Sequence, residues 1–200
     1  MALSTLDRQT ALIIIDLQKG IVSRSFAHPV AEVVKNARAL ADAFRTHTLP
    51  VVLVNVAGMA PGRTEQVRRM GDLPAGWTDL IPELGQQPAD HCITKYTTGA
   101  FAKTGLEEHL RGRGVTQVVL AGISTSVGVE STARQAYELG FHVTLASDAM
   151  TDASMDSHIH SLTTIFPRLG ESGTTQEVLN LLVGTRVGGN SPEDSGANNH

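Results

Sequence analysis

Four short runs of apolar residues stand out along the chain, and each is rich in β-branched side chains. They lie at residues 11–15, 51–54, 118–121 and 143–146. The runs do not alternate with polar residues, which is typical of parallel strands that helices cover on both faces. A weaker run at residues 91–95 predicts one more strand.

Between these runs, apolar residues recur at a spacing of three or four positions, as they do on one face of a helix. The segments interpreted as helices are residues 29–47, 105–112, 129–139 and 154–166. Gly140 and Pro167 follow the last two, where these residue types commonly end a helix. Thr174 resembles a helix cap three residues before Glu177 and therefore begins a fifth helix.

This alternation of strands and helices predicts a doubly wound α/β fold. We expect a mostly parallel sheet of five or six strands between helix layers, a three-layer arrangement of the Rossmann type. One domain is expected over residues 1–183, followed by a flexible tail over residues 184–200, which are rich in glycine, asparagine and serine. Residues 57–90 show no clear period, and so long a connection is usually a lid or a subunit contact.

Composition narrows the class of protein. The length of 200 residues suits one domain, and a hydrophobic fraction of 41% is sufficient for a core. The net charge of −4 without a basic block argues against a nucleic-acid partner. We expect no membrane span and no signal peptide, and hence a cytoplasmic protein. The single cysteine, Cys92, excludes a disulfide within the chain and a cysteine-rich zinc site.

Residues with reactive side chains follow several of the predicted strands, where ligands bind in this class of fold. Asp16 follows the first strand, and Lys95 ends the strand at residues 91–95. The strand at residues 118–121 leads into the turn at residues 124–128, whose N–H groups are suited to an anionic oxygen. This pattern fits a catalytic site, and it fits equally a buried Asp–Lys ion pair that ties two loops together.

Four segments resemble, in this order and spacing, the isochorismatase-like hydrolases, which include nicotinamidases, N-carbamoylsarcosine amidohydrolases and isochorismatases. They are ALIIIDLQ (11–18), ITKYTTGAF (93–101), VVLAGISTSVGVESTARQAYELGFHVTLASDAMTD (118–152) and IFPRLGESGTTQEVL (165–179). The family usually works through an Asp, a Lys and a Cys. By resemblance these roles fall to Asp16, Lys95 and position 128, which is Gly128 here. Isochorismatases proper also have glycine at this position, so the chain resembles that subgroup.

The resemblance implies hydrolysis without a covalent thiol intermediate, because glycine has no side chain that can attack a substrate. Isochorismatases cleave an enol ether, so Asp16 is expected to act as the general acid and Lys95 as a positioning charge. The expected substrate is a small anionic molecule, and no cofactor or metal is expected. Family members often have a non-proline cis peptide before the residue that matches Ser124. Substrate contacts are expected from Gln18, Tyr96, Phe101, Ser124 and Val127.

The sequence leaves the protonation state of Asp16 open. Burial raises the pKa of an aspartate, whereas a neighbouring lysine ammonium lowers it, so the two residues are treated as a coupled pair. Cys92 lies three residues before Lys95 inside a strand and is expected to be a small buried hydrophobe.

Three further groups of residues could also form a site. Arg63, Arg68 and Arg69 are expected to form a solvated face, with binding of a substrate carboxylate as the alternative. His158 and His160 would point apart on a helix, which argues against a shared metal.

The third group, Ser124, Thr125 and Ser126, has no histidine nearby in the sequence and is expected to shape the turn rather than to act as nucleophiles. Two functions besides enol-ether hydrolysis stay open: a catalytically silent protein for ligand binding or assembly, and an amidase that uses activated water. We also expect a homo-oligomer, because the family usually assembles.

Overall fold

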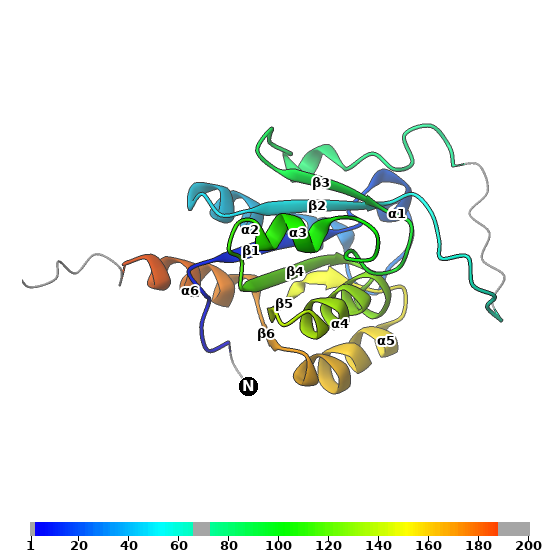
Figure 1. The fold of residues 1–200 in the computed structure, drawn as a ribbon. Coiled ribbons are helices and arrows are strands. Elements are labelled where there is room, and N and C mark those ends of the chain that lie inside the picture. Colours follow the sequence, from blue (N-terminus) through cyan, green and yellow to red (C-terminus); the bar gives the residue numbers. More distant parts are fainter. Residues whose placement is uncertain (1–2, 66–72, 188–200) are drawn as a thin grey trace, which may run out of the picture.

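The computed structural model describes residues 3–65 and 73–187. In these residues six parallel strands lie in the order β3-β2-β1-β4-β5-β6 (Figure 1). They are β1 (Thr10–Ile15), β2 (Val51–Val56), β3 (His91–Lys95), β4 (Gln117–Ile123), β5 (His142–Thr151) and β6 (Glu171–Gly173). The predicted doubly wound α/β class is confirmed. The apolar pattern missed β6 because this short strand, ESG, contains no apolar run.

In the described residues an α-helix follows each strand except β2, and each predicted helical segment contains one. They are α1 (Lys19–Val22), α2 (Val30–Thr46), α3 (Leu106–Arg111), α4 (Glu130–Glu138), α5 (Met155–His160) and α6 (Thr175–Val187). The predicted helix at residues 154–166 is divided, since α5 ends at His160 and is continued by a π-helical turn and a 3-10 turn. Pro167 explains the irregular end, because its nitrogen has no hydrogen to donate.

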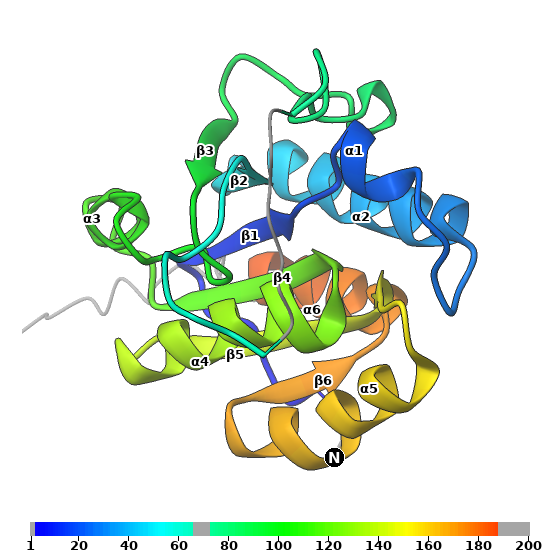
Figure 2. The same ribbon diagram turned by 90° about the vertical axis from the view of Figure 1, so that its right-hand side faces the viewer.

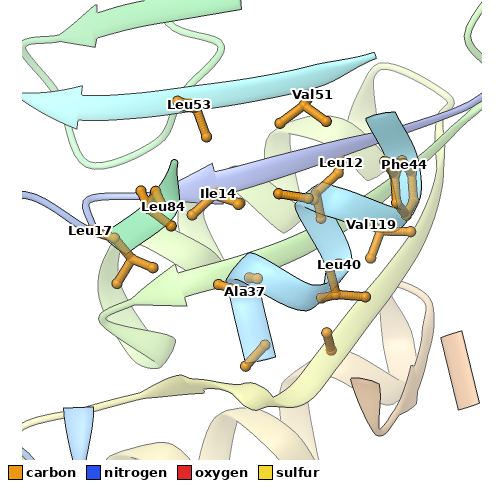
Figure 3. Close-up of a cluster of buried hydrophobic side chains, with 14 of the residues drawn as sticks. Leu12, Ile14, Leu17, Ala37, Leu40, Phe44, Val51, Leu53, Leu84 and Val119 are labelled. Atoms are coloured by element: carbon orange, nitrogen blue, oxygen red, sulfur yellow. The ribbon is translucent and has the colours of Figure 1, made fainter. Parts of the chain in front are cut away.

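Apolar side chains of the central strands point to both faces of the sheet, which explains why their runs do not alternate. On one face, Leu12 and Ile14 of β1 belong to the same cluster as Leu40 and Phe44 of α2 (Figure 3). Ile13 belongs to the cluster on the opposite face. Helices α2 and α6 cover the first face, and α3 and α4 cover the second (Figure 2).

Strand β3 lies at one edge of the sheet, and its burial alternates. Ile93 and Lys95 are buried, whereas Cys92 and Thr94 are exposed. The expectation that Cys92 is a buried hydrophobe is therefore wrong: its Sγ accepts a hydrogen bond from Gln86 Nε2 at 3.0 Å near the surface. The reason is the edge position, which leaves one face of the strand uncovered.

The C-terminal helix α6 begins at the predicted threonine cap. Glu177 N donates to Thr174 Oγ1 at 3.2 Å, and Thr174 N donates to Glu177 Oε2 at 2.7 Å. The helix extends to Val187 and so includes the first residues of the predicted tail, while residues 188–200 lie outside the described residues. No helix in the described part of the chain is long and apolar enough to cross a membrane.

The strand order reverses at β1, and this reversal locates the site. From β1 the chain builds outward through β2 to β3, and it then returns to β4 on the other side of β1. In doubly wound folds, ligands bind at the carboxyl ends of the strands at such a reversal. Gly122 of β4 has a φ of 120° and lies directly against the backbone of Ile15, so the ends of β1 and β4 approach closely there.

Candidate active site

Asp16 and Lys95 meet at the carboxyl edge of the sheet. Asp16 directly follows β1, and Lys95 is the last residue of β3, which β2 separates from β1. Both side chains are buried, and Lys95 Nζ lies 2.8 Å from Asp16 Oδ2. Lys95 Nζ also donates to the backbone oxygen of Thr97 at 3.2 Å. The parallel strands therefore bring together two residues that lie far apart in the sequence.

The two carboxylate oxygens of Asp16 have different surroundings. Oδ2 accepts the hydrogen bond from Lys95, whereas Oδ1 is buried and has no hydrogen-bond partner among the described residues. Burial raises the pKa of Asp16 from its ordinary 3.8 to about 6, and the opposing effects of the Lys95 charge and hydrogen bond are smaller. The question that the sequence left open is thus decided in favour of burial.

Residues 124–129, called the site turn below, follow β4 and face Asp16. The peptide bond between Ile123 and Ser124 is cis, as the resemblance implied. The turn is π-helical over Thr125–Val129, and Gly128 within it is buried. A Cβ atom added to Gly128 would lie 3.3 Å from Asp16 Oδ2 and 2.9 Å from Cγ2 of Ile15. At position 128 the turn therefore approaches the Asp16 carboxyl.

Several of the N–H groups expected to receive an anionic oxygen already have partners. Ser126 N donates to Asp152 Oδ2 at 2.7 Å. Val127 N and Val129 N both donate to the backbone oxygen of Ser124 at 3.1 Å. These three amides stabilise the turn itself, so the expectation that the N–H groups of residues 124–128 are open donors is wrong for Ser126 and Val127.

The residues expected to contact substrate have different positions. Tyr96 is 62% exposed and lies against Gly58, and Val127 is 37% exposed beside Gly128. Ser124 is half-buried at the start of the site turn. Phe101 is half-buried and its ring packs against Phe141, with 5.9 Å between the ring centroids.

Gln18 differs from the expectation of a substrate-binding residue. Its side chain is fully buried, and its Nε2 donates to the backbone oxygens of Val56 and Trp77 at 3.0 and 3.3 Å. Its Oε1 accepts from Val56 N at 2.7 Å. The amide is thus used to join the end of β1 to the end of β2 and to the following loop, since buried polar groups require such partners.

The long connection at residues 57–90 is only partly described. Arg63 is exposed, as expected for a solvated face, while Arg68 and Arg69 lie outside the described residues. A short 3-10 turn, Pro82–Leu84, interrupts the connection, and Leu80 forms an isolated antiparallel bridge with Gln18.

The histidines of α5 have separate surroundings. His158 is buried and His160 is exposed, so they do not face one another. Among residues 3–65 and 73–187, no three His, Cys, Asp or Glu side chains group as metal ligands would. Two surface cavities of about 550 and 470 Å³ are lined by residues such as Pro50 and Gln117 at the amino ends of the strands, far from Asp16 along each strand.

Sequence reasoning missed the residues that hold the site turn in place. Asp152 accepts hydrogen bonds from Ser126, and His158 lies 2.8 Å from the Thr125 hydroxyl through its Nδ1. Thr132 Oγ1 donates to the backbone oxygen of Gly128 at 2.7 Å. The signal for Asp152 was its place after a strand, but the predicted strand stopped at residue 146 whereas β5 extends to Thr151.

The fold and the site together define an α/β enzyme with a buried acid–lysine pair at the carboxyl edge of a parallel sheet. The family model described as Isochorismatase domain matches residues 10–177. The uncharacterized isochorismatase family protein YwoC of Bacillus subtilis is 44% identical over 179 residues, which cover 86% of this chain and 93% of that protein. Streptothricin hydrolase of Streptomyces noursei is 34% identical over 140 residues, covering 70% of this chain and 48% of that protein.

A solved structure gives the same result. An isochorismatase family protein from Burkholderia thailandensis has a TM-score of 0.86 with 40% sequence identity, covering 90% of this chain and 98% of that one. The chain belongs to the isochorismatase family and is a hydrolase.

Proposed function

We propose that the chain hydrolyses a small anionic enol ether with Asp16 as general acid and without a thiol intermediate. By resemblance, Gly128 takes the position of the cysteine in thiol-dependent members of the family, and the only cysteine of the chain, Cys92, lies three residues before Lys95 on the edge strand. The observation that supports the proposal is the Asp16 carboxyl, which is buried, has a pKa of about 6 and keeps one oxygen without a protein partner.

The geometry suggests how the proton moves. Protonated Asp16 gives its proton to the terminal carbon of the enol ether, and the adjacent carbon becomes an oxocarbenium ion. Water adds to that carbon and returns a proton to Asp16, and the resulting hemiketal separates into a ketone and an alcohol. The Lys95 ammonium, 2.8 Å from Oδ2, stabilises the carboxylate while the proton is on the substrate. No step of this proposal requires a metal or cofactor.

Isochorismate and simpler enolpyruvyl ethers test the proposal through release of pyruvate. Because the acid form is required, kcat/KM is expected to fall tenfold for each pH unit above about 6, the pKa of Asp16. The measurement is a pH–rate profile between pH 5 and pH 8, in which roughly two pH units lie above the pKa of Asp16, where the rate is expected to fall. A profile that rises through pH 6 would contradict the acid role.

A water-activating amidase is the second candidate, and one observation favours it. With a pKa of about 6, Asp16 is mostly ionised at neutral pH, which is the form that removes a proton from water. Amide hydrolysis by this route rises with pH through about 6, opposite to the enol-ether profile. Absence of turnover with enol ethers, amides and esters would instead indicate a silent protein that serves in ligand binding or assembly.

Restoring the thiol by Gly128→Cys is a separate prediction. The new Cβ would approach Cγ2 of Ile15 at 2.9 Å and the backbone oxygen of Ile123 at 3.3 Å, so the neighbouring atoms must shift by a few tenths of an ångström to admit it. We expect the variant to fold with a loss of about 1 kcal/mol and to gain amide hydrolysis through a covalent intermediate. Mass spectrometry of the trapped intermediate measures this, with Gly128→Ser as control. A folded variant whose thiol forms no adduct with any amide contradicts the assignment of position 128.

We also propose that the chain self-associates and lies in the cytoplasm, as expected from the sequence. The exposed apolar side chains of Met155 and Ile159 on α5 support self-association, because such side chains are commonly covered by a partner.

A further inference from the structure

Two buried side chains outside the acid–lysine pair hold the site turn. Asp152 directly follows β5 and is 5% exposed. Its Oδ2 accepts hydrogen bonds from Ser126 N at 2.7 Å and Ser126 Oγ at 2.8 Å, and its Oδ1 accepts from Ser154 N at 3.3 Å. No ion pair of the described residues includes Asp152, and these hydrogen bonds compensate for its burial.

His158 holds the preceding residue of the turn from a different element. Its Nδ1 lies 2.8 Å from Thr125 Oγ1, and both side chains are buried. Burial and the neighbouring His28 ring, 4.7 Å away between centroids, lower the pKa of His158 and outweigh the opposing charge of Asp152, so the imidazole is neutral at neutral pH. A neutral ring can accept the Thr125 hydroxyl hydrogen. Because Thr125 is fully buried, this pair cannot present a nucleophile to a substrate.

The two contacts act on consecutive residues of the turn that carries Gly128. Asp152 reaches Ser126 from the end of β5, and His158 reaches Thr125 from α5, so the turn is restrained from two directions. Gly128 follows two residues later, and a Cβ added there would lie 3.3 Å from Asp16 Oδ2. A shift of the turn would therefore change how tightly the Asp16 carboxyl is enclosed.

We propose that Asp152 and His158 are positioning residues of the hydrolytic site, which hold the site turn over Asp16 without touching the substrate. This inference deepens the proposed function and rests on it for the role of Asp16. A purely structural role would cost stability alone, whereas a positioning role also changes the environment of Asp16.

The chain offers a matched control. Asp148, on the same strand β5, accepts hydrogen bonds from Thr175 N at 2.6 Å and Thr175 Oγ1 at 2.7 Å, which repeats the Asp152–Ser126 pattern at the start of α6. Asp148→Ala removes a comparable helix-start contact far from the site turn. Its expected effect is a lower melting temperature with an unchanged pKa of Asp16.

The experiment is a carboxyl ¹³C NMR titration of Asp16 in the full chain, which needs no substrate. In Asp152→Ala the turn opens and admits water, so the pKa of Asp16 is expected to fall by about one unit towards its ordinary value. Asp152→Asn keeps an acceptor for Ser126 N, so the pKa of Asp16 is expected to stay close to its value in the parent protein. The variant separates hydrogen bonding from charge, because asparagine removes the charge as alanine does.

Thr125→Val tests the His158 contact without changing any charge, and it remains informative if Asp152→Ala does not fold. We expect its Asp16 pKa to fall as well, and, where hydrolysis is measured, kcat to fall about tenfold with KM within about twofold. If Asp152→Ala and Thr125→Val lose stability but leave the pKa of Asp16 unchanged, as Asp148→Ala does, the positioning role is overturned. If Asp16 has no catalytic role, the variant Asp16→Asn keeps its hydrolytic activity, and this result does not depend on the titration.

Discussion

Asp16→Asn is expected to lower hydrolysis by about two to four orders of magnitude, because asparagine keeps the shape of the side chain but cannot transfer a proton. The exposed Asp79–Lys19 pair, at 2.9 Å, provides the control, since Asp79→Asn removes the same kind of charge from the surface. That control is expected to retain activity within about twofold and to lose less than about 1 kcal/mol. Steady-state rates at pH 6 make the comparison. Turnover by Asp16→Asn within tenfold of the parent protein would exclude Asp16 as the proton donor.

The same substitution has a consequence for the pH dependence of stability. The pKa of Asp16 is raised from 3.8 to about 6 on folding, so the folded state binds this proton more tightly than the unfolded chain. The contribution of Asp16 to stability is therefore full below about pH 4 and is lost as pH rises to about 6. The change is of order 3 kcal/mol.

Urea unfolding at pH 4, 5, 6 and 7 measures this loss as the difference between the parent protein and Asp16→Asn. The difference removes the opposite contributions of other carboxyl groups, such as Glu171, whose pKa is lowered by hydrogen bonds from Ser4. Identical pH slopes for the two proteins would show that the carboxyl of Asp16 is not buried in solution.

Gly122→Ala is expected to have the largest effect on stability, a loss of more than about 4 kcal/mol or failure to fold. Its φ of 120° disfavours any residue with a Cβ, and the added atom would overlap the backbone oxygen of Ile15 and approach its nitrogen at 2.6 Å. Backbone atoms cannot rotate aside as the end of a side chain can. The substitution would therefore push apart β1 and β4 at the residue that precedes Asp16.

Gly114→Ala separates the two causes of this loss. Gly114 also has a positive φ, 68°, but no atom outside its chain neighbours lies within 4 Å of an added Cβ. Its expected cost is about 1 kcal/mol, from backbone conformation alone. Chemical denaturation of both variants gives the comparison. Equal costs would mean that the close approach of the two strands makes no energetic contribution.

Much of the fold could be predicted from local pattern, because hydrophobic periodicity reports which faces are covered. The runs at residues 11–15 and 118–121 became the adjacent central strands β1 and β4, with both faces buried. The same rule failed for Cys92, since the run at residues 91–95 does not reveal that β3 lies at an edge. It also failed for β6, which is too short to carry a pattern.

The candidate site shows the same division. Asp16 and Lys95 could be paired from the sequence because the carboxyl ends of parallel strands share one edge of a sheet. The expectation that Gln18 contacts the substrate could not be corrected from the sequence. Only the folded chain shows that its amide binds the backbone of Val56 and Trp77. Asp152 was missed because β5 continues beyond its apolar run to Thr151.

By itself, the sequence determined the class of sheet, the pair Asp16 and Lys95, and the absence of a thiol at Gly128, since these depend on residue identity and spacing along the chain. Only the tertiary structure decided the direction in which the pKa of Asp16 is shifted. Burial is a property of everything packed around a group, and here its effect on the pKa of Asp16 exceeds that of the lysine 2.8 Å away. Long-range contacts likewise decided which side chains, Asp152 and His158, hold the turn above it.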